Sequence, residues 1–239
     1  RMDWWREARF GMFIHWGLYS VAGGEWQGTR GNMIASWLQN ELFIPPDQYS
    51  AALLPGFTAT NYDPAAWAAL ANRAGMKYAV LTSKHHEGFS LFDSAHTSYD
   101  VMATPAGRDV MGEYLTAFRA AGLKAGLYFS VIDWYHPEYP VDGLHPLRNN
   151  PTAVAEPRNT AAYVDFMHDQ VEEIVTNYGL IDIMWWDFSY GNMQGATWRA
   201  DELIDMVFEH QPQIVMNTRL FEGILNDTGD FATPEQYIP

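Results

Sequence analysis

The strongest constraint on the fold is the alternation of short apolar segments with longer amphipathic ones along most of the sequence. Strands are predicted at residues 11–16, 77–82, 124–130, 181–188 and 213–217, with a weaker sixth at 229–233. Helices are predicted at residues 46–53, 63–74, 108–121, 160–177 and 198–210, with an amphipathic stretch at 2–9 and one helical turn near 34–40. Because strand and helix alternate, we predict an α/β protein in which helices cover a parallel sheet.

The residues at the strand ends distinguish two ways of arranging such a sheet. A doubly wound sheet usually carries a G-x-G-x-x-G loop after its first strand, but here that strand ends in His15 and Trp16. Polar residues lie at the ends of the first five strands: His15, the run Lys84-His85-His86-Glu87, Tyr128, Asp187, and Asn217 with Arg219. A TIM-type (β/α) barrel gathers its chemistry at these carboxyl ends. We therefore expect residues 1–239 to form a single catalytic, barrel-like domain.

Asp187 lies near the end of a strongly apolar strand and directly follows Trp185 and Trp186. Burying an ionised carboxylate is costly, so an acid in these surroundings needs a partner. This segment alone leaves a structural role at the strand end and a catalytic role equally open. Asp182 lies on the opposite face of the same strand, because side chains alternate along a strand, and is expected to be structural.

The composition narrows the range of partners. A net charge of −15 argues against nucleic acid and anionic membranes, since both require basic patches. The absence of cysteine excludes disulfides and thiolate chemistry. No apolar window of about twenty residues and no basic, apolar leader is visible, so neither a transmembrane helix nor a signal peptide is expected, and the compartment stays open. Aromatic residues make up 15% of the chain, which suits a packed interior and also a carbohydrate site.

The polar strand ends allow two kinds of chemistry. In the first, His15, His85 and His86 join Asp187 in binding a divalent metal that activates water. The spacing argues weakly against this hypothesis, because neighbouring residues on an extended segment point to opposite faces and rarely bind one metal together.

The second chemistry is glycoside hydrolysis, which needs one carboxylate as nucleophile and a second carboxyl group as acid and base. Asp187 can supply the nucleophile, and a nearby Arg219 would favour its ionised form. The second carboxyl group must come from another loop. The candidates are Glu25, Glu41, Glu87, Glu222 and Glu235.

Five segments together resemble the retaining α-L-fucosidases of glycoside hydrolase family 29. They are residues 10–20 (FGMFIHWGLYS), 84–89 (KHHEGF), 108–109 (RD), 185–187 (WWD) and 217–219 (NTR). They occur in the family's order, and the likeness runs from residue 4 to residue 239. The resemblance implies a retaining exo-glycosidase without a cofactor, which hydrolyses terminal α-L-fucosides through a covalent fucosyl-enzyme intermediate. The implied partner is a fucosylated oligosaccharide or glycoconjugate.

The resemblance also implies roles for individual residues. It assigns the nucleophile to Asp187 and the acid/base to Glu235, with Glu222 as the reserve candidate. The implied substrate-binding residues are His15, Trp37, His85, His86, Tyr128 and Arg219. The chain departs from the family at Ser36, which stands where a sugar-binding Glu is usual. A non-catalytic fucose-binding remnant therefore stays open as an alternative, and so does a metal-dependent barrel hydrolase that uses His15, His85 and His86.

The number of predicted strands points to an incomplete barrel. Family members continue with further barrel strands and a C-terminal β-sandwich, whereas about six strands are predicted here and no such sandwich. An unclosed barrel leaves a sheet edge and apolar surface to be covered. We therefore expect either a homo-oligomer or closure by the long segment 133–157.

Overall fold

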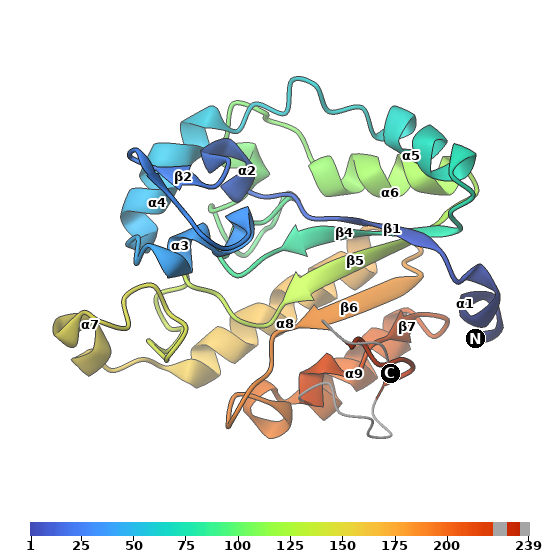
Figure 1. Cartoon of the computed structure of the whole chain (residues 1–239). Coiled ribbons are helices and arrows are strands. Elements are labelled where there is room, and N and C mark those ends of the chain that lie inside the picture. Colours follow the sequence, from blue (N-terminus) through green and yellow to red (C-terminus); the bar gives the residue numbers. More distant parts are fainter. Residues whose placement is uncertain (222–228, 235–239) are drawn as a thin grey trace.

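Five parallel strands form the central sheet of the computed structural model, which describes residues 1–221 and 229–234 (Figure 1). In sheet order they are β1 (Gly11–Ile14), β4 (Tyr78–Lys84), β5 (Lys124–Ser130), β6 (Ile183–Asp187) and β7 (Val215–Met216). A separate two-stranded hairpin pairs β2 (Glu25–Trp26) with β3 (Thr29–Arg30). The helices are α1 (Asp3–Ala8), α2 (Tyr19–Ala22), α3 (Leu38–Glu41), α4 (Pro46–Leu53), α5 (Pro64–Arg73), α6 (Val110–Ala120), α7 (Pro151–Ala155), α8 (Thr160–Asn177) and α9 (Ala200–His210).

The parallel α/β architecture confirms the predicted fold class. Neighbouring strands follow one another in sequence, and helices of the crossover segments pack on the outer side of the sheet, with α6 against β4 and β5. The outward side chains Leu81, Leu127 and Met184 belong to the large core between sheet and helices. Alternate side chains of a strand face opposite sides of the sheet, so every second residue of each strand packs into this core.

The sheet is curled, as a part of a barrel must be. The ring centroids of Phe13 on β1 and Trp185 on β6 lie only 4.9 Å apart, although β4 and β5 run between these strands. In a flat sheet, three strand spacings would separate them by about 14 Å. The inner face therefore closes on itself, as in a partial TIM barrel.

Helix α1 fills the opening of the curled sheet at the amino-terminal ends of its strands. Trp5 packs on Tyr78 of β4 and stacks on Phe231, with ring centroids 5.0 Å and 4.3 Å away. Arg1 donates to the carbonyl oxygen of Ile214 and pairs with Asp230. Trp4, Trp5 and Phe231 all pack on the same inner cluster, so residues far apart in the sequence share it.

Two predictions about the end of the barrel need correction. The expected sixth strand is reduced to an isolated bridge between Asn217 and Phe231, because the side chain of Asp230 accepts the Met216 backbone N–H that a regular ladder would use. The long segment 133–157 adds no strand to the described sheet. It forms α7 instead and is tied to α3, where Arg148 donates to the carbonyl oxygen of Asn40.

Helix starts follow their capping residues. Asp63 accepts the backbone N–H of Ala66 at the start of α5, where Pro64 occupies the first turn. Asp109 caps α6 in the same way through Gly112, and it also accepts the hydroxyl hydrogen of Tyr178 at 2.6 Å. Asp109 therefore connects the start of α6 to the end of α8, which is a structural task.

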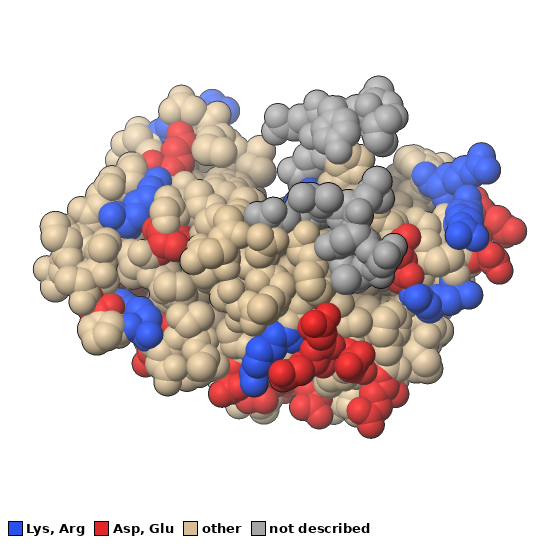
Figure 2. All heavy atoms as spheres, turned by 90° about the horizontal axis from the view of Figure 1, so that it is seen from below, with Lys and Arg blue, Asp and Glu red and all other residues tan. Residues whose placement is uncertain are grey.

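The acidic composition is visible on the surface. Helix α9 buries Leu203 and Val207 and exposes Asp201, Glu202 and Asp205. In the view from below, acidic side chains form a larger group than the basic ones (Figure 2). Within the described residues, no helix combines the length and the apolar character needed to cross a bilayer.

Candidate active site

Asp187 lies at the carboxyl end of β6 on the inner side of the curled sheet, with 9% of its surface exposed. The hydroxyl of Tyr128 donates to Oδ2 over 2.7 Å, and Nη1 of Arg219 donates to Oδ1 over 2.8 Å. Each carboxylate oxygen thus receives one donor, and hydrogen bonds to a charged acceptor are the stronger kind. The arrangement holds an ionised carboxylate in one orientation while leaving further lone pairs unused.

His86 lies beside this carboxylate. Its Nε2 is 3.9 Å from Oδ2 of Asp187, and only 1% of the residue is exposed. Burial, followed by the neighbouring imidazole of His85, lowers the pKa of His86 well below its ordinary value. The imidazole beside Asp187 is therefore neutral near pH 7.

His85 and His86 lie side by side, which corrects the expectation that they point to opposite faces. Their ring centroids are 4.0 Å apart, and the His85 ring also stacks on Tyr128. Alternation fails here because the register of β4 shifts between Thr82 and Lys84 and the chain then leaves the strand. Neighbours in sequence can therefore line the same site.

His15 extends the cluster from β1 to the neighbouring strands. Its ring centroid lies 5.6 Å from that of His85 and 5.5 Å from that of Tyr128. More than a third of its surface is open to solvent, while its packed side and nearby His85 lower its pKa to about 4. His15 is thus a neutral imidazole at the rim of the site.

The described residues contain no group of three or more His, Asp or Glu side chains placed to bind a metal ion. Nδ1 of His86 lies 2.8 Å from the hydroxyl of Ser130, so Nε2 is the ring nitrogen that faces Asp187. The metal hypothesis gains no ligand set from this part of the chain.

Trp37 supplies an aromatic wall. It ends the 3₁₀ helix Ala35–Trp37, and its ring lies 5.2 Å from His86 and 5.7 Å from Phe188, measured between centroids. Ser36, which precedes it, is 7% exposed. A flat apolar ring beside the imidazole of His86 is a surface on which a sugar ring can stack.

The two acid/base candidates, Glu222 and Glu235, lie outside the described residues. The segment that leads to Glu235 is nevertheless joined to the site, because Arg219 donates through Nε to Oγ1 of Thr233 and through Nη2 to its carbonyl oxygen. These bonds measure 2.5 Å and 2.9 Å. Arg219 thus connects Asp187 to the polypeptide just before Glu235.

The other three carboxyl candidates are placed differently. Glu25 is exposed on β2, and Glu41 accepts the backbone N–H groups of Asn32 and Met33, which holds a loop. Glu87 is only 2% exposed, and its Oε2 lies 3.4 Å from Nδ1 of His85. The carboxylate of Glu87 thus lies next to the imidazole of His85, a contact that the sequence His85-His86-Glu87 did not predict.

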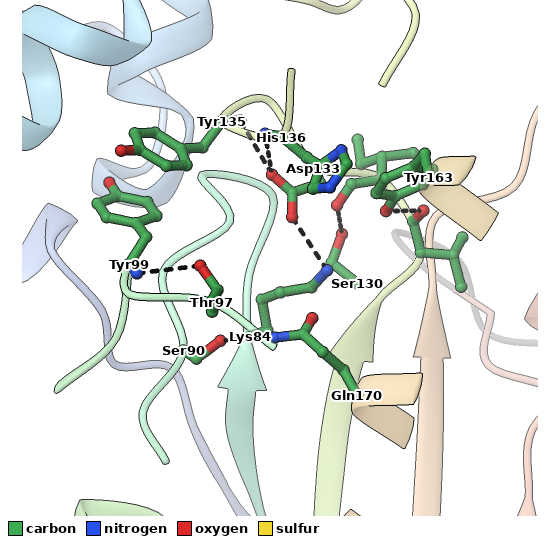
Figure 3. A network of polar contacts seen from close by, with 12 residues as sticks. Lys84, Ser90, Thr97, Tyr99, Ser130, Asp133, Tyr135, His136, Tyr163 and Gln170 are labelled. Atoms are coloured by element: carbon green, nitrogen blue, oxygen red, sulfur yellow. Dashed lines mark hydrogen bonds and ion pairs between the residues drawn. The ribbon is translucent and has the colours of Figure 1, made fainter. Parts of the chain in front are cut away.

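Lys84, the residue before His85, forms a buried ion pair with Asp133 (Figure 3). Nζ of Lys84 lies 3.1 Å from Oδ2 of Asp133, and both side chains are almost fully buried. Oδ1 of Asp133 accepts the backbone N–H groups of Tyr135 and His136. The pair therefore joins the end of β4, just before His85, to the start of segment 133–157.

Asp182 directly precedes β6 and contacts β5. Its carboxylate accepts from Nζ of Lys124 over 2.8 Å and from the backbone N–H of Ala125 over 3.0 Å. These bonds tie β6 to β5 and agree with the expected structural role.

Comparison with known proteins gives consistent similarities. The family model Alpha-L-fucosidase matches residues 1–239. Tissue alpha-L-fucosidase of Rattus norvegicus is 32% identical over 228 residues, which are 90% of this chain and 46% of that protein. Putative alpha-L-fucosidase of Caenorhabditis elegans is 31% identical over 99% of this chain and 48% of its own. The chain thus spans about half the length of these curated relatives.

Solved structures give the same picture. Alpha-L-fucosidase isoenzyme 1 from Paenibacillus thiaminolyticus is 47% identical with a TM-score of 0.90, over 100% of this chain and 56% of that one. Alpha-L-fucosidase AlfC from Lactobacillus casei, in complex with its alpha-L-fucose product, is 33% identical with a TM-score of 0.88. That match covers 98% of this chain and 74% of AlfC, and a variant of AlfC was solved with Fuca(1,6)GlcNAc.

Proposed function

The chain belongs to the alpha-L-fucosidase family, and from this premise we propose that it is a retaining exo-glycosidase acting on terminal α-L-fucosides. The observation that carries the proposal is the Asp187 carboxylate, held by Tyr128 and Arg219 at the end of a barrel strand. A carboxylate fixed at this end of a TIM-type strand is placed for catalysis.

In the proposed mechanism, an oxygen of Asp187 attacks the anomeric carbon and forms a covalent fucosyl-enzyme intermediate. Glu235, with Glu222 as the reserve candidate, protonates the leaving oxygen and then activates the water that releases fucose. Attack from opposite faces in the two steps retains the anomeric configuration. Arg219 supports this assignment by connecting Asp187 to Thr233, two residues before Glu235.

The proposed substrate is a fucosylated oligosaccharide or glycoconjugate. The imidazole, hydroxyl and guanidinium groups around Asp187 would contact the sugar hydroxyls, and Trp37 would pack on the ring. We assign this binding to His15, Trp37, His85, His86, Tyr128 and Arg219. The complexes of the relative AlfC with fucose and with Fuca(1,6)GlcNAc are consistent with this class of ligand.

We also propose that a second copy of the chain covers the unpaired edge at β1. Phe10, which directly precedes β1, is 51% exposed, and among the described strands β1 has a neighbour on one side only. A strand edge with apolar side chains favours association. Static light scattering should therefore give a mass above that of one chain, and a stable monomer at high concentration would contradict the association.

The function is tested by release of nitrophenol from its α-L-fucoside. Wild-type protein should turn over, Asp187→Gly should not, and azide should restore activity to that variant by forming fucosyl azide. Asp182→Asn is the matched control, since Asp182 directly precedes β6 and its carboxylate bonds to Lys124 and Ala125 of β5, and it should keep activity. Binding of fucose without wild-type turnover would favour the non-catalytic alternative, and inactivation by a chelator would favour the metal-dependent one.

A further inference from the structure

The hydroxyl of Ser130 takes part in two buried hydrogen bonds behind His86. Nδ1 of His86 lies 2.8 Å from Oγ of Ser130, and this Oγ donates to the carbonyl oxygen of Ile132 over 2.7 Å. Ser130 and Ile132 are 0% exposed and His86 is 1% exposed, so water does not compete for these groups. Figure 3 shows Ser130 beside the buried pair of Lys84 and Asp133.

These bonds determine which imidazole nitrogen carries the hydrogen. A hydroxyl has one hydrogen to donate, and a carbonyl oxygen can only accept. Since Ser130 gives its hydrogen to Ile132, its oxygen must accept at the other contact, and Nδ1 of His86 must be the donor. The reverse arrangement would leave the buried carbonyl oxygen of Ile132 without this donor, which is unfavourable.

The other nitrogen of His86 faces the candidate nucleophile. With Nδ1 protonated and the ring neutral, Nε2 presents a lone pair, and it lies 3.9 Å from Oδ2 of Asp187. Two acceptors face one another, and neither can donate to the other. Oδ2 already accepts a hydrogen bond from Tyr128, whereas the lone pair of Nε2 is left for a hydrogen that a bound molecule brings.

We propose that Ser130 is a positioning residue, which holds His86 in the Nδ1–H tautomer so that Nε2 accepts a hydrogen bond from a hydroxyl of the bound sugar. The identity of the ligand rests on the proposed function, whereas the tautomer rests on the buried bonds alone. The consequence is a specificity rule: the sugar position next to His86 must carry a hydrogen donor. A fluorine or a methoxy group at that position keeps an acceptor but removes the donor, and both should be rejected like the deoxy compound.

The tautomer can be read directly from long-range ¹H–¹⁵N spectra of protein labelled with ¹⁵N-histidine, with His86→Gln assigning the signals. Wild type should show His86 neutral and protonated at Nδ1 near pH 7. Ser130→Ala should move part of the population to the Nε2–H form. Ser130→Thr, which keeps the oxygen, should restore the wild-type pattern.

Ser83→Ala is the matched control. Ser83 is also fully buried, and its hydroxyl donates to a backbone carbonyl oxygen, that of Tyr128, over 2.7 Å. Its removal deletes an equivalent hydroxyl and should leave the His86 signals unchanged. A wild-type His86 that is protonated at Nε2, or is an imidazolium, would overturn the proposal even if Ser130→Ala failed to fold. An unchanged tautomer in folded Ser130→Ala would also overturn the role of Ser130.

Kinetics provide the second readout. We expect Ser130→Ala to lower kcat/KM on the nitrophenyl α-L-fucoside about 3- to 10-fold, the effect of one net hydrogen bond. The loss should vanish on the monodeoxy substrate for which His86→Ala also has no effect. An equal loss on every deoxy substrate would contradict positioning through His86. If wild type has no turnover, the proposed function fails while the spectra still decide the tautomer.

Discussion

The hydroxyl of Tyr128 on β5 lies 2.7 Å from Oδ2 of Asp187 on β6 and donates a hydrogen bond to it. The two residues are not paired in the sheet, since Ser130 lies opposite Asp187 in the register. The long phenol side chain therefore reaches along the inner face to the carboxylate. Burial, and then the charge of Asp187, raise the pKa of Tyr128 well above its ordinary value, so the phenol keeps its hydrogen.

Tyr128→Phe tests the contribution of this bond to turnover. The variant removes one donor from a charged acceptor and keeps the packing of the ring, so kcat/KM should fall about 10- to 100-fold. Steady-state kinetics on the nitrophenyl α-L-fucoside measure the loss. Tyr114→Phe is the control, because the Tyr114 hydroxyl is equally buried but donates to the carbonyl oxygen of Gly126. Equal effects of the two substitutions would show that the bond to Asp187 contributes no more to turnover than any other buried tyrosine hydroxyl.

Arg219→Lys should be nearly as harmful as removal of the side chain. Arg219 uses three different nitrogens to reach Asp187 Oδ1, Thr233 Oγ1 and the Thr233 carbonyl oxygen, and one ammonium group cannot reproduce this fork. We expect a loss of about 100-fold in kcat/KM. Arg199→Lys, at a more exposed ion pair with Asp165, should change the rate less than about 2-fold. A mild effect of Arg219→Lys would show that turnover requires only a positive charge next to Asp187 and not the hydrogen bonds of the guanidinium group.

The pair of Lys84 and Asp133 should be important for stability. Breaking a buried pair leaves an uncompensated charge, so Lys84→Met and Asp133→Asn should each lower the free energy of unfolding by about 3–5 kcal/mol. The double variant should lose less than the sum of the single losses. Urea unfolding of the four proteins gives this coupling.

The control for that cycle is the partly exposed pair of Arg108 and Glu113. Solvent and entropy reduce the value of such a pair, so each single substitution there should cost less than about 1 kcal/mol. Strict additivity at Lys84 and Asp133 would contradict the interpretation of the buried pair as a coupled unit.

His145 should make the protein less stable in acid. It is 4% exposed, its Nε2 donates to the carbonyl oxygen of Trp134, and its Nδ1 accepts the backbone N–H of Leu147. Burial lowers its pKa to about 4, whereas a histidine in the unfolded chain has a pKa of about 6.5. The unfolded state therefore binds its proton first as the pH falls, and the stability that is present above about pH 6.5 is lost progressively down to about pH 4.

The magnitude can be measured by urea unfolding. At about pH 5, this histidine should account for a loss of about 2 kcal/mol relative to pH 7, so His145→Gln should be less sensitive to pH than wild type. Parallel curves for wild type and His145→Gln would exclude His145 as the source.

Much of the fold could be predicted because it depends on local patterns. The predicted segments 124–130 and 160–177 have the same bounds as β5 and α8, since the apolar period and the flanking capping residues are contained within each segment. The position of Asp187 at a strand end was also predictable, because it depends on the length of one apolar run.

The side-by-side histidines could not be predicted. Their arrangement depends on a register shift between β4 and β5, and on a chain that leaves the strand at His85, neither of which is visible in the periodicity. The same holds for the bonds of Ser130 to His86 and of Arg219 to Thr233, which join residues 44 and 14 positions apart. Periodicity specifies which side of an element is buried, but contacts between distant segments depend on the packing of the whole chain. The amino-acid sequence therefore determined the strands and the polar residues at their ends. Three-dimensional packing decided which of those residues meet around Asp187 and which of their atoms are in contact.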